Sequence, residues 1–303
     1  MSVTNTEPIP SLARRELSPL PAQPSATVRL LRQVLRTRVT VIGLAIVVFL
    51  VILAIIVDFL PLDDPNVMDS SVLRAPPGTP GHLLGTDAFG RDVLSRVLYG
   101  SRVSLVISFA VVGSASVIGS LLGLLAGYLG GAFDSIISRI WDVIFSFPGI
   151  LFLLVIMSTL GAGVEMAIVA LTISSIPIFG RLMRERVMAQ RSRQYVEAAR
   201  CLGASPWYIM TRHVLPNSLT SVLVEAALAI PGVILAEAAL SYLGLGVPPP
   251  TPSWGKMISE GQDILEVAPW LSIVPGFFIL LTTLGFNLVG DGLRDFFDPT
   301  QLK

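Results

Sequence analysis

The chain has 303 residues, of which 52% are hydrophobic and only 14% are charged, and its mean hydropathy is +0.74. Soluble domains carry roughly 25% charged residues, so this composition excludes an ordinary soluble domain and indicates an integral membrane protein. The net charge of zero gives no reason to expect nucleic acid as a partner, and the single cysteine, Cys201, excludes an internal disulfide and a paired-cysteine zinc site. The two histidines, His82 and His213, are far apart in the sequence, so we expect no metal site.

Residues 1–39 precede the first apolar run. The first 24 of them are rich in Pro and Ser, a composition typical of disordered chains. Residues 27–38, TVRLLRQVLRTR, combine basic and apolar positions in the manner of a helix that lies on anionic lipid. We therefore expect a partly disordered tail whose last part touches the membrane surface.

Six apolar runs are long enough to cross a bilayer, which needs about 20 mainly apolar residues per helix. They cover residues 41–60, 103–126, 143–160, 164–180, 219–243 and 271–289. Pro148 and Gly149 interrupt the third run, and only residues 161–163 separate it from the fourth. The predicted fold class is an all-α membrane protein with six transmembrane helices.

The basic residues are divided unevenly between the two sides that six spans define. Sixteen of the 21 Lys and Arg residues lie on the side of the two termini, and five lie on the opposite side. Because cytoplasmic segments carry the excess of Lys and Arg, both termini are predicted to be cytoplasmic. The resulting organisation is a cytoplasmic tail over 1–39, a first transmembrane helix over 40–60, an external loop with an interfacial helix over 61–102, a five-helix core over 103–295 and a cytoplasmic C-terminus over 296–303.

Two features of the external segments predict contact with the outer membrane surface. Within residues 91–99, Leu94, Val97 and Leu98 share one face, which predicts an amphipathic helix lying flat on the membrane. Trp254 and Trp270 are predicted to mark the level of the lipid headgroups.

Small residues recur every four positions in the second run, at Ala115, Gly119, Gly123 and Gly127. Such a strip lets another helix approach closely in a membrane. The partner is either a helix of the same bundle or a helix of a second subunit.

Residues 193–216, here called the knob, follow the fourth run and contain two short helical segments. The first has helical composition up to Gly203, which suits a left-handed position after a helix. Ser205 is a good N-cap for the second, and Pro206 suits its first turn. Pro216 is predicted to end this second helix.

The surface of the knob is typical of a protein interface. Trp207, Met210 and Val214 recur at spacings of three and four and are predicted to share one face. Ala198 and Ala199 are small enough to admit a neighbouring helix. Aromatic residues and Met beside Arg are enriched at protein interfaces. The alternative is a basic cytoplasmic loop that packs on its own bundle.

Two carboxylates, Glu225 and Glu237, lie in the fifth run, where burial in lipid is costly and a functional role is the usual expectation. They are twelve residues apart and point about 120° away from each other at about 100° per residue. Pro231, between them, can bend the helix. One of the carboxylates is expected to line a substrate path, with a structural carboxylate hydrogen-bonded between helices as the alternative.

The knob resembles the EAA loop of binding-protein-dependent ABC importers. In that loop a Glu-Ala-Ala segment is followed by a glycine and, after nine further residues, by Ile-x-Leu-Pro. Here Glu197-Ala198-Ala199 precedes Gly203, and His213-Val214-Leu215-Pro216 follows after nine residues, so that His213 stands in the Ile position. The resemblance implies that the knob docks on a cytoplasmic ATPase subunit through Glu197, Ala198, Ala199, Gly203, Ser205, Pro206, Trp207, Met210, Leu215 and Pro216.

Three further segments, residues 82–102, 237–255 and 287–299, resemble the C-type permeases of the dipeptide, oligopeptide and nickel importers. The resemblance covers most of the chain from about residue 80 and implies a type I permease fold in a bacterial cytoplasmic membrane. It also implies three kinds of partner: a second permease, two ATPase subunits or domains, and an external substrate-binding protein.

The expected function is to form a path for di- or oligopeptides, with nickel or glutathione as alternative substrates. The chain has no P-loop motif, so ATP and Mg²⁺ are expected on the ATPase subunits and no cofactor on this chain. A membrane-embedded enzyme that uses Glu225 or Glu237 as acid or base is a competing hypothesis from another class. A channel or receptor that works alone is another, although it would need no knob for an ATPase.

Overall fold

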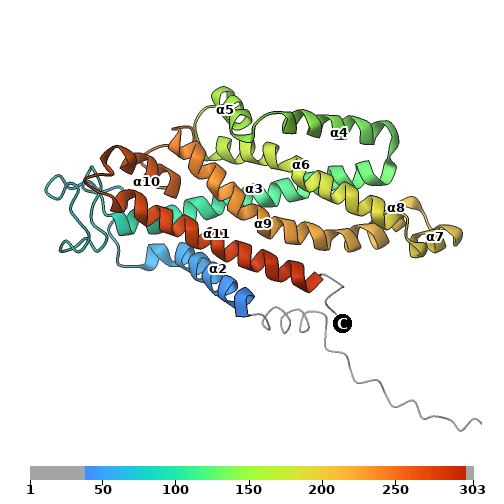
Figure 1. The fold of residues 1–303 in the computed structure, drawn as a ribbon, viewed down its shortest axis with the longest axis horizontal. Helices are drawn as coiled ribbons and strands as arrows, with labels where there is room; N and C mark the ends of the chain where they lie inside the picture. The colour runs from blue at the N-terminus through green and yellow to red at the C-terminus, as the bar shows by residue number, and fades with distance from the viewer. Residues whose placement is uncertain (1–37, 298–303) are drawn as a thin grey trace, which may run out of the picture.

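A computed structural model describes residues 38–297, and every regular element in this range is helical (Figure 1). The α-helices are α2 (Arg38–Ile56), α3 (Val93–Leu129), α4 (Gly131–Ser146), α5 (Gly149–Leu160), α6 (Val164–Arg191), α7 (Gln194–Cys201), α8 (Pro206–Ile209), α9 (Leu215–Tyr242), α10 (Trp254–Gly261) and α11 (Trp270–Phe297). Short 3₁₀ turns follow α2 and α10, and a π turn, Met210–Val214, joins α8 to α9. The expectations for the N-terminal tail before Arg38 and for residues 298–303 lie outside the described residues.

Five helical segments are long and apolar enough to cross a membrane, and a sixth exists only if α4 and α5 together form one broken span. Those two helices meet at 97°, so the third apolar run over residues 143–160, which Pro148 and Gly149 interrupt, is not one straight helix. Phe147 is extended between them, as a residue before proline usually is, and Pro148 cannot continue the hydrogen bonding of α4.

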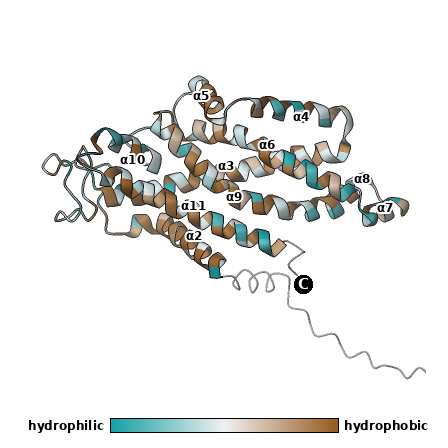
Figure 2. Ribbon diagram, viewed as in Figure 1, coloured by the Kyte–Doolittle hydropathy of each residue, from teal (hydrophilic) through white to brown (hydrophobic). Residues whose placement is uncertain are grey.

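The long helices lie side by side along the bundle (Figure 1). The knob, the start of α2 and the end of α11 are at one end, whereas α10 and the loop that precedes α3 are at the other. Six passes across a membrane, with α4 and α5 counted as one pass, require the start of α2 and the end of α11 to lie at the same end of the bundle. Figure 2 shows that α2 is hydrophobic along almost its whole length, while hydrophilic residues gather on α7 and toward the end of α11.

The strip of small residues on α3 packs against α6 of the same chain. A Cβ atom on Gly119 would lie 2.6 Å from the carbonyl oxygen of Ile176, and one on Gly127 would lie 2.8 Å from that of Arg184. Gly123 approaches the Gly180 carbonyl more closely still. This face is therefore filled within the chain, and the alternative of a second subunit on it is wrong.

The start of α3 differs from the expected flat interfacial helix. Residues 93–129 form one continuous helix, and Val97 and Leu98 are buried inside the bundle rather than against lipid. The sequence interpretation began the second span at Val103 and counted Arg91, Arg96 and Arg102 among the charges of the external segments. Arg91 and Arg96 are instead buried, since carboxylates inside the fold neutralise them.

Candidate functional site

The corner of the knob is set by local backbone geometry. The amide of Ala204 donates to the carbonyl oxygen of Ala199 at 3.0 Å, which closes the end of α7. Gly203 has φ = +82°, a left-handed conformation that glycine adopts without strain. No atom lies within 4 Å of a Cβ built on it, so this position requires glycine for its conformation and not for space.

The second helix of the knob begins as predicted but does not end where predicted. The Ser205 hydroxyl oxygen accepts from the amide of Tyr208 at 3.3 Å, with Pro206 in the first turn. The π turn then leads directly into α9, with Pro216 in the first turn of that helix. The prediction that Pro216 ends the helix is wrong. Because the π turn precedes it, Pro216 stands in the first turn of α9, where a backbone N–H has no intrahelical acceptor, so the N–H that proline lacks breaks no helical hydrogen bond.

The exposed and buried residues of the knob do not follow the predicted common face. Met210 and Val214 are buried against the bundle, whereas Trp207 is 68% exposed. Leu202, which the sequence interpretation missed, is 88% exposed, and Tyr208 is 51% exposed. The knob therefore packs on its own bundle with one part of its surface and leaves large apolar side chains exposed on another, as binding surfaces do.

The residues of the Glu-Ala-Ala segment lie on the open side of α7. Glu197 and Ala198 are exposed, and Ala199 is half-buried against the core. His213 lies close to Tyr195 and Tyr208, with ring centroids 6.1 and 5.6 Å away. This ring cluster ties α7 to α8, which gives His213 a structural role in the position where the family pattern has Ile.

A cavity of about 810 Å³, here called the inner cavity, opens behind the knob between α6, α9 and α11. Glu225 lines it, as the substrate-path hypothesis requires. The other lining residues are Leu182, Arg186, Gln190, Asn217, Thr220, Ser221, Val224, Leu228, Arg294 and Phe297.

The other two residues expected along the path do not reach this cavity. Glu237 is fully buried, and it accepts hydrogen bonds from the hydroxyls of Ser241 at 2.7 Å and Ser104 at 3.3 Å. Pro231 is buried within a continuous α9. In this conformation Glu237 matches the alternative of a structural carboxylate hydrogen-bonded between helices.

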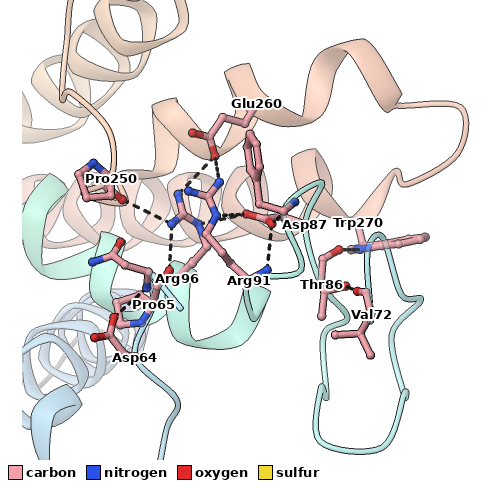
Figure 3. Close-up of polar contacts among 12 residues, drawn as sticks. Asp64, Pro65, Val72, Thr86, Asp87, Arg91, Arg96, Pro250, Glu260 and Trp270 are labelled. Carbon is pink, nitrogen blue, oxygen red and sulfur yellow. Dashed lines mark hydrogen bonds and ion pairs between the residues drawn. The ribbon is translucent and has the colours of Figure 1, made fainter. Parts of the chain in front are cut away.

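At the opposite end of the bundle, four charged residues form an ionic cluster that we call the outer clamp (Figure 3). Asp87 and Glu260 face the guanidinium groups of Arg91 and Arg96. Arg91 donates to Asp87 at 2.6 Å and to Glu260 at 2.7 Å, and Arg96 donates to Glu260 at 3.3 Å. Two positive and two negative charges thus balance one another where little water reaches them.

The outer clamp joins three parts of the chain. Arg96 also donates to the carbonyl oxygens of Pro65, at 3.0 Å, and of Pro250, at 3.5 Å. Trp254 is fully buried beside it, and its Nε1 donates to the carbonyl of Val97 at 3.1 Å, so the prediction that Trp254 marks the headgroup level is wrong. The loop before α3, the first turn of α3 and α10 are therefore held as one unit.

No group of three or more His, Cys, Asp or Glu residues in the described range could hold a metal ion. The exposed apolar side chains of the knob suit docking, and the side chains that line the inner cavity suit polar contact.

Comparison with known proteins identifies the family. The model of a family described as "Binding-protein-dependent transport system inner membrane component" matches residues 119–303. The chain belongs to this family. It is a permease subunit of an ABC importer, and its fold is that of the type I permeases.

Curated relatives cover nearly the whole chain. The dipeptide transport system permease protein DppC of Alkalihalophilus pseudofirmus is 40% identical over 269 residues, which is 88% of each chain. The glutathione transport system permease protein GsiD of Pectobacterium atrosepticum is 43% identical over 88% of this chain and 89% of that protein. The probable D,D-dipeptide permease DdpC of Escherichia coli is 41% identical over 86% and 87%.

A solved structure of the inward-facing MetNI methionine ABC transporter shares the fold. Its TM-score is 0.53 at 19% identity, and the alignment covers 66% of this chain and 97% of that one.

Proposed function

We propose that the chain forms, with a second permease, the path by which an ATP-driven importer moves di- or oligopeptides into the bacterial cytoplasm. The dipeptide and D,D-dipeptide permeases among its relatives support this substrate class. An external binding protein delivers the peptide to the end of the bundle that carries α10. ATP and Mg²⁺ bind to two ATPase subunits and not to this chain.

The knob couples ATP hydrolysis to the path, and one observation carries this part of the proposal. Leu202, Trp207 and Tyr208 are large, exposed apolar side chains on a compact two-helix corner at a hydrophilic end of the bundle. Such residues in a water-exposed position indicate a protein partner. The Glu-Ala-Ala segment on the open side of α7 supports an ATPase as that partner.

The knob end of the bundle faces the cytoplasm in this proposal. Of the 15 Lys and Arg residues within 38–297, ten belong to the segments that the six-span topology places on the side of the knob, and an excess of positive charge is a cytoplasmic feature. The inner cavity, which opens beside the knob, is then the cytoplasmic half of the path, and Glu225 lines it.

Glutathione is a second candidate substrate. The relative that transports it is 43% identical, slightly more than the dipeptide permease at 40%. Glutathione is itself a tripeptide, so the same path chemistry would serve both substrates.

The test is uptake and ATP hydrolysis by the reconstituted complex of both permeases, the ATPases and the binding protein. Trp207→Ala should lower peptide uptake at least ~10-fold, because truncating a docking residue of this kind commonly costs 2 kcal/mol or more, about a 30-fold loss of binding. Gly203→Val should do the same by straining the corner. Cys201→Ser, an exposed change two residues before Gly203, is the matched control.

Three results would count against the coupling role. The first is full uptake by both the Trp207→Ala and the Gly203→Val complexes, with the chain inserted normally. The second is labelling of the knob from outside the cell. The third is solute transport by this chain without an ATPase.

A further inference from the structure

The face of α9 that lines the inner cavity is polar over two turns. Asn217, Thr220, Ser221 and Glu225 recur at spacings of three and four and therefore share one side of the helix. A helix face in contact with lipid does not carry such a row. The lining residues of α9 extend from Asn217 to Leu228, about 16 Å along the axis at about 1.5 Å per residue. The inner cavity is therefore a water-accessible space inside the transport assembly.

Two arginines enter the same cavity from other helices. Arg186 comes from α6 and Arg294 from α11, so the positive charges stand on different walls from the carboxylate of Glu225. The cavity thus offers groups of both signs, with neutral hydrogen-bonding side chains between them.

Arg186 differs from the other arginines of α6. Arg181 pairs with an aspartate on α4 at 2.7 Å, Arg184 pairs with another, and Arg191 donates to a backbone carbonyl at 2.9 Å. Within residues 38–297, by contrast, neither the Arg186 guanidinium nor the Glu225 carboxylate makes a side-chain hydrogen bond or ion pair. Three arginines of α6 thus hold the fold together, and the fourth is available to a ligand.

We propose that the inner cavity binds a zwitterionic peptide in transit, with its ammonium group on Glu225 and its carboxylate on Arg186 and Arg294. This inference rests on the proposed function and names the chemistry that the path recognises. Guanidinium groups suit carboxylates because they donate two parallel hydrogen bonds. Two guanidinium groups beside one carboxylate repel a bare divalent cation, so this path disfavours a free nickel ion.

The volume of the cavity suits a short peptide. Sites for small ligands occupy about 300–1,000 Å³, and about 810 Å³ falls within that range. A di- or tripeptide fits with both ends engaged, whereas a longer peptide can engage only one end at a time. Binding along a transport path must also be weak enough for release, which contacts at two separate ends allow.

The first test pairs each variant with a matched change in the peptide, in the reconstituted complex at peptide concentrations that saturate the binding protein. Arg186→Gln should lower uptake of a free dipeptide about 10-fold, equivalent to ~1.4 kcal/mol, and uptake of its C-terminal amide less than about 2-fold. Glu225→Gln should discriminate in the same way between the free and the N-acetylated dipeptide. Because each variant is compared with wild type on the same peptide, the preference of the binding protein cancels.

The control variant is Arg139→Gln, which removes the same charge from an α4 side chain that is 85% exposed. It should leave the uptake of every peptide within about 2-fold of wild type, since Arg139 does not line the cavity.

The second test measures occupancy directly. In the nucleotide-free complex, with Cys201→Ser and cysteine-free partners, a Ser221→Cys thiol in the cavity is labelled with a maleimide. Millimolar free dipeptide should slow the labelling, and the amide should slow it less. Arg186→Gln should remove this difference.

The outcomes separate this proposal from the function on which it rests. If the wild-type complex imports no peptide, both fall. If it imports peptide but Arg186→Gln lowers uptake of the free and amidated forms equally, or the dipeptide gives no protection at Ser221→Cys, the importer stands and the zwitterion site is wrong.

Discussion

Glu260→Gln tests whether the outer clamp stabilises the outer end of the bundle. Glu260 accepts charged hydrogen bonds from Arg91 at 2.7 Å and from Arg96 at 3.3 Å, and it is 20% exposed. The variant leaves two buried guanidinium groups with only Asp87 as a counter-charge. Breaking a fully buried pair costs about 3–5 kcal/mol, and one hydrogen bond to a charged group contributes about 1.5–3 kcal/mol.

The expected loss in the free energy of unfolding is ~2 kcal/mol, near the low end of these ranges. Glu260 is partly exposed, and the Gln side chain keeps an amide oxygen that can accept a hydrogen bond. For a chain of 303 residues the thermal midpoint should fall by about 3 °C. Intrinsic tryptophan fluorescence of the purified complex is a suitable assay, because Trp254 lies in α10. Glu266→Gln, at an exposed site on the same side of the bundle, is the control.

A double-mutant cycle decides whether the effect comes from the ion pair. Arg91→Gln and Glu260→Gln should be less than additive by at least ~1 kcal/mol, since the second change removes a charge that the first has already left unpaired. The reasoning is refuted if the Glu260→Gln variant and the Glu266→Gln control have the same thermal midpoint. It is also refuted if the effects of Arg91→Gln and Glu260→Gln on the free energy of unfolding are additive.

Three further predictions concern helix packing and capping. Gly123→Ala should cost ~1–3 kcal/mol because its Cβ would press on the Gly180 carbonyl, whereas Gly113→Ala, with no atom within 4 Å of the new Cβ, should be neutral or stabilising; equal thermal midpoints would contradict this. Ser205→Ala should destabilise the start of α8 by about 1 kcal/mol, seen as faster amide hydrogen exchange in its first turn. Unchanged exchange there would show that the Ser205 N-cap does not stabilise this helix. Arg184→Gln breaks a half-buried ion pair between α6 and α4. It should lower the free energy of local opening of α4 by up to ~1 kcal/mol, seen as faster amide hydrogen exchange; identical exchange rates would show that apolar packing alone holds α4.

Local rules of the chain located much of this structure in advance. Runs of about 20 apolar residues located the spans, because a membrane leaves no other arrangement for an apolar backbone segment of that length. The corner of the knob was predictable for the same kind of reason, since Gly203, Ser205 and Pro206 act on their own backbone and that of their neighbours.

Contacts between distant residues account for most of what the sequence could not predict. Glu260 is 169 residues from Arg91, so nothing in the local sequence indicates that a carboxylate inside the fold neutralises this arginine. The interruption of the third run was visible at Pro148, but the angle between α4 and α5 was not, because hydropathy carries no directional information. The prediction for Pro216 was wrong because a π turn, which no residue type marks, precedes this proline and places it in the first turn of α9.

The candidate site was predictable in part. Glu225 was found because a carboxylate in an apolar run is conspicuous, whereas Arg186 was counted only among the cytoplasmic charges. Leu202 gave no periodic signal, because it stands alone in the last turn before Gly203. Exposure of a single apolar residue depends on the tertiary fold, and only the structure reveals it.

The helix that leaves the knob does not stop at the middle of the membrane. From Pro206 to Tyr242 the chain forms one helical rod of 37 residues, about 55 Å long at about 1.5 Å per residue. If the segment tilts as one body by about 10° about its inner tip, its far tip moves by roughly 10 Å, at least ten times the sub-ångström shifts that a packed interior absorbs. Events at the two water boundaries are thus mechanically linked by a single stretch of backbone.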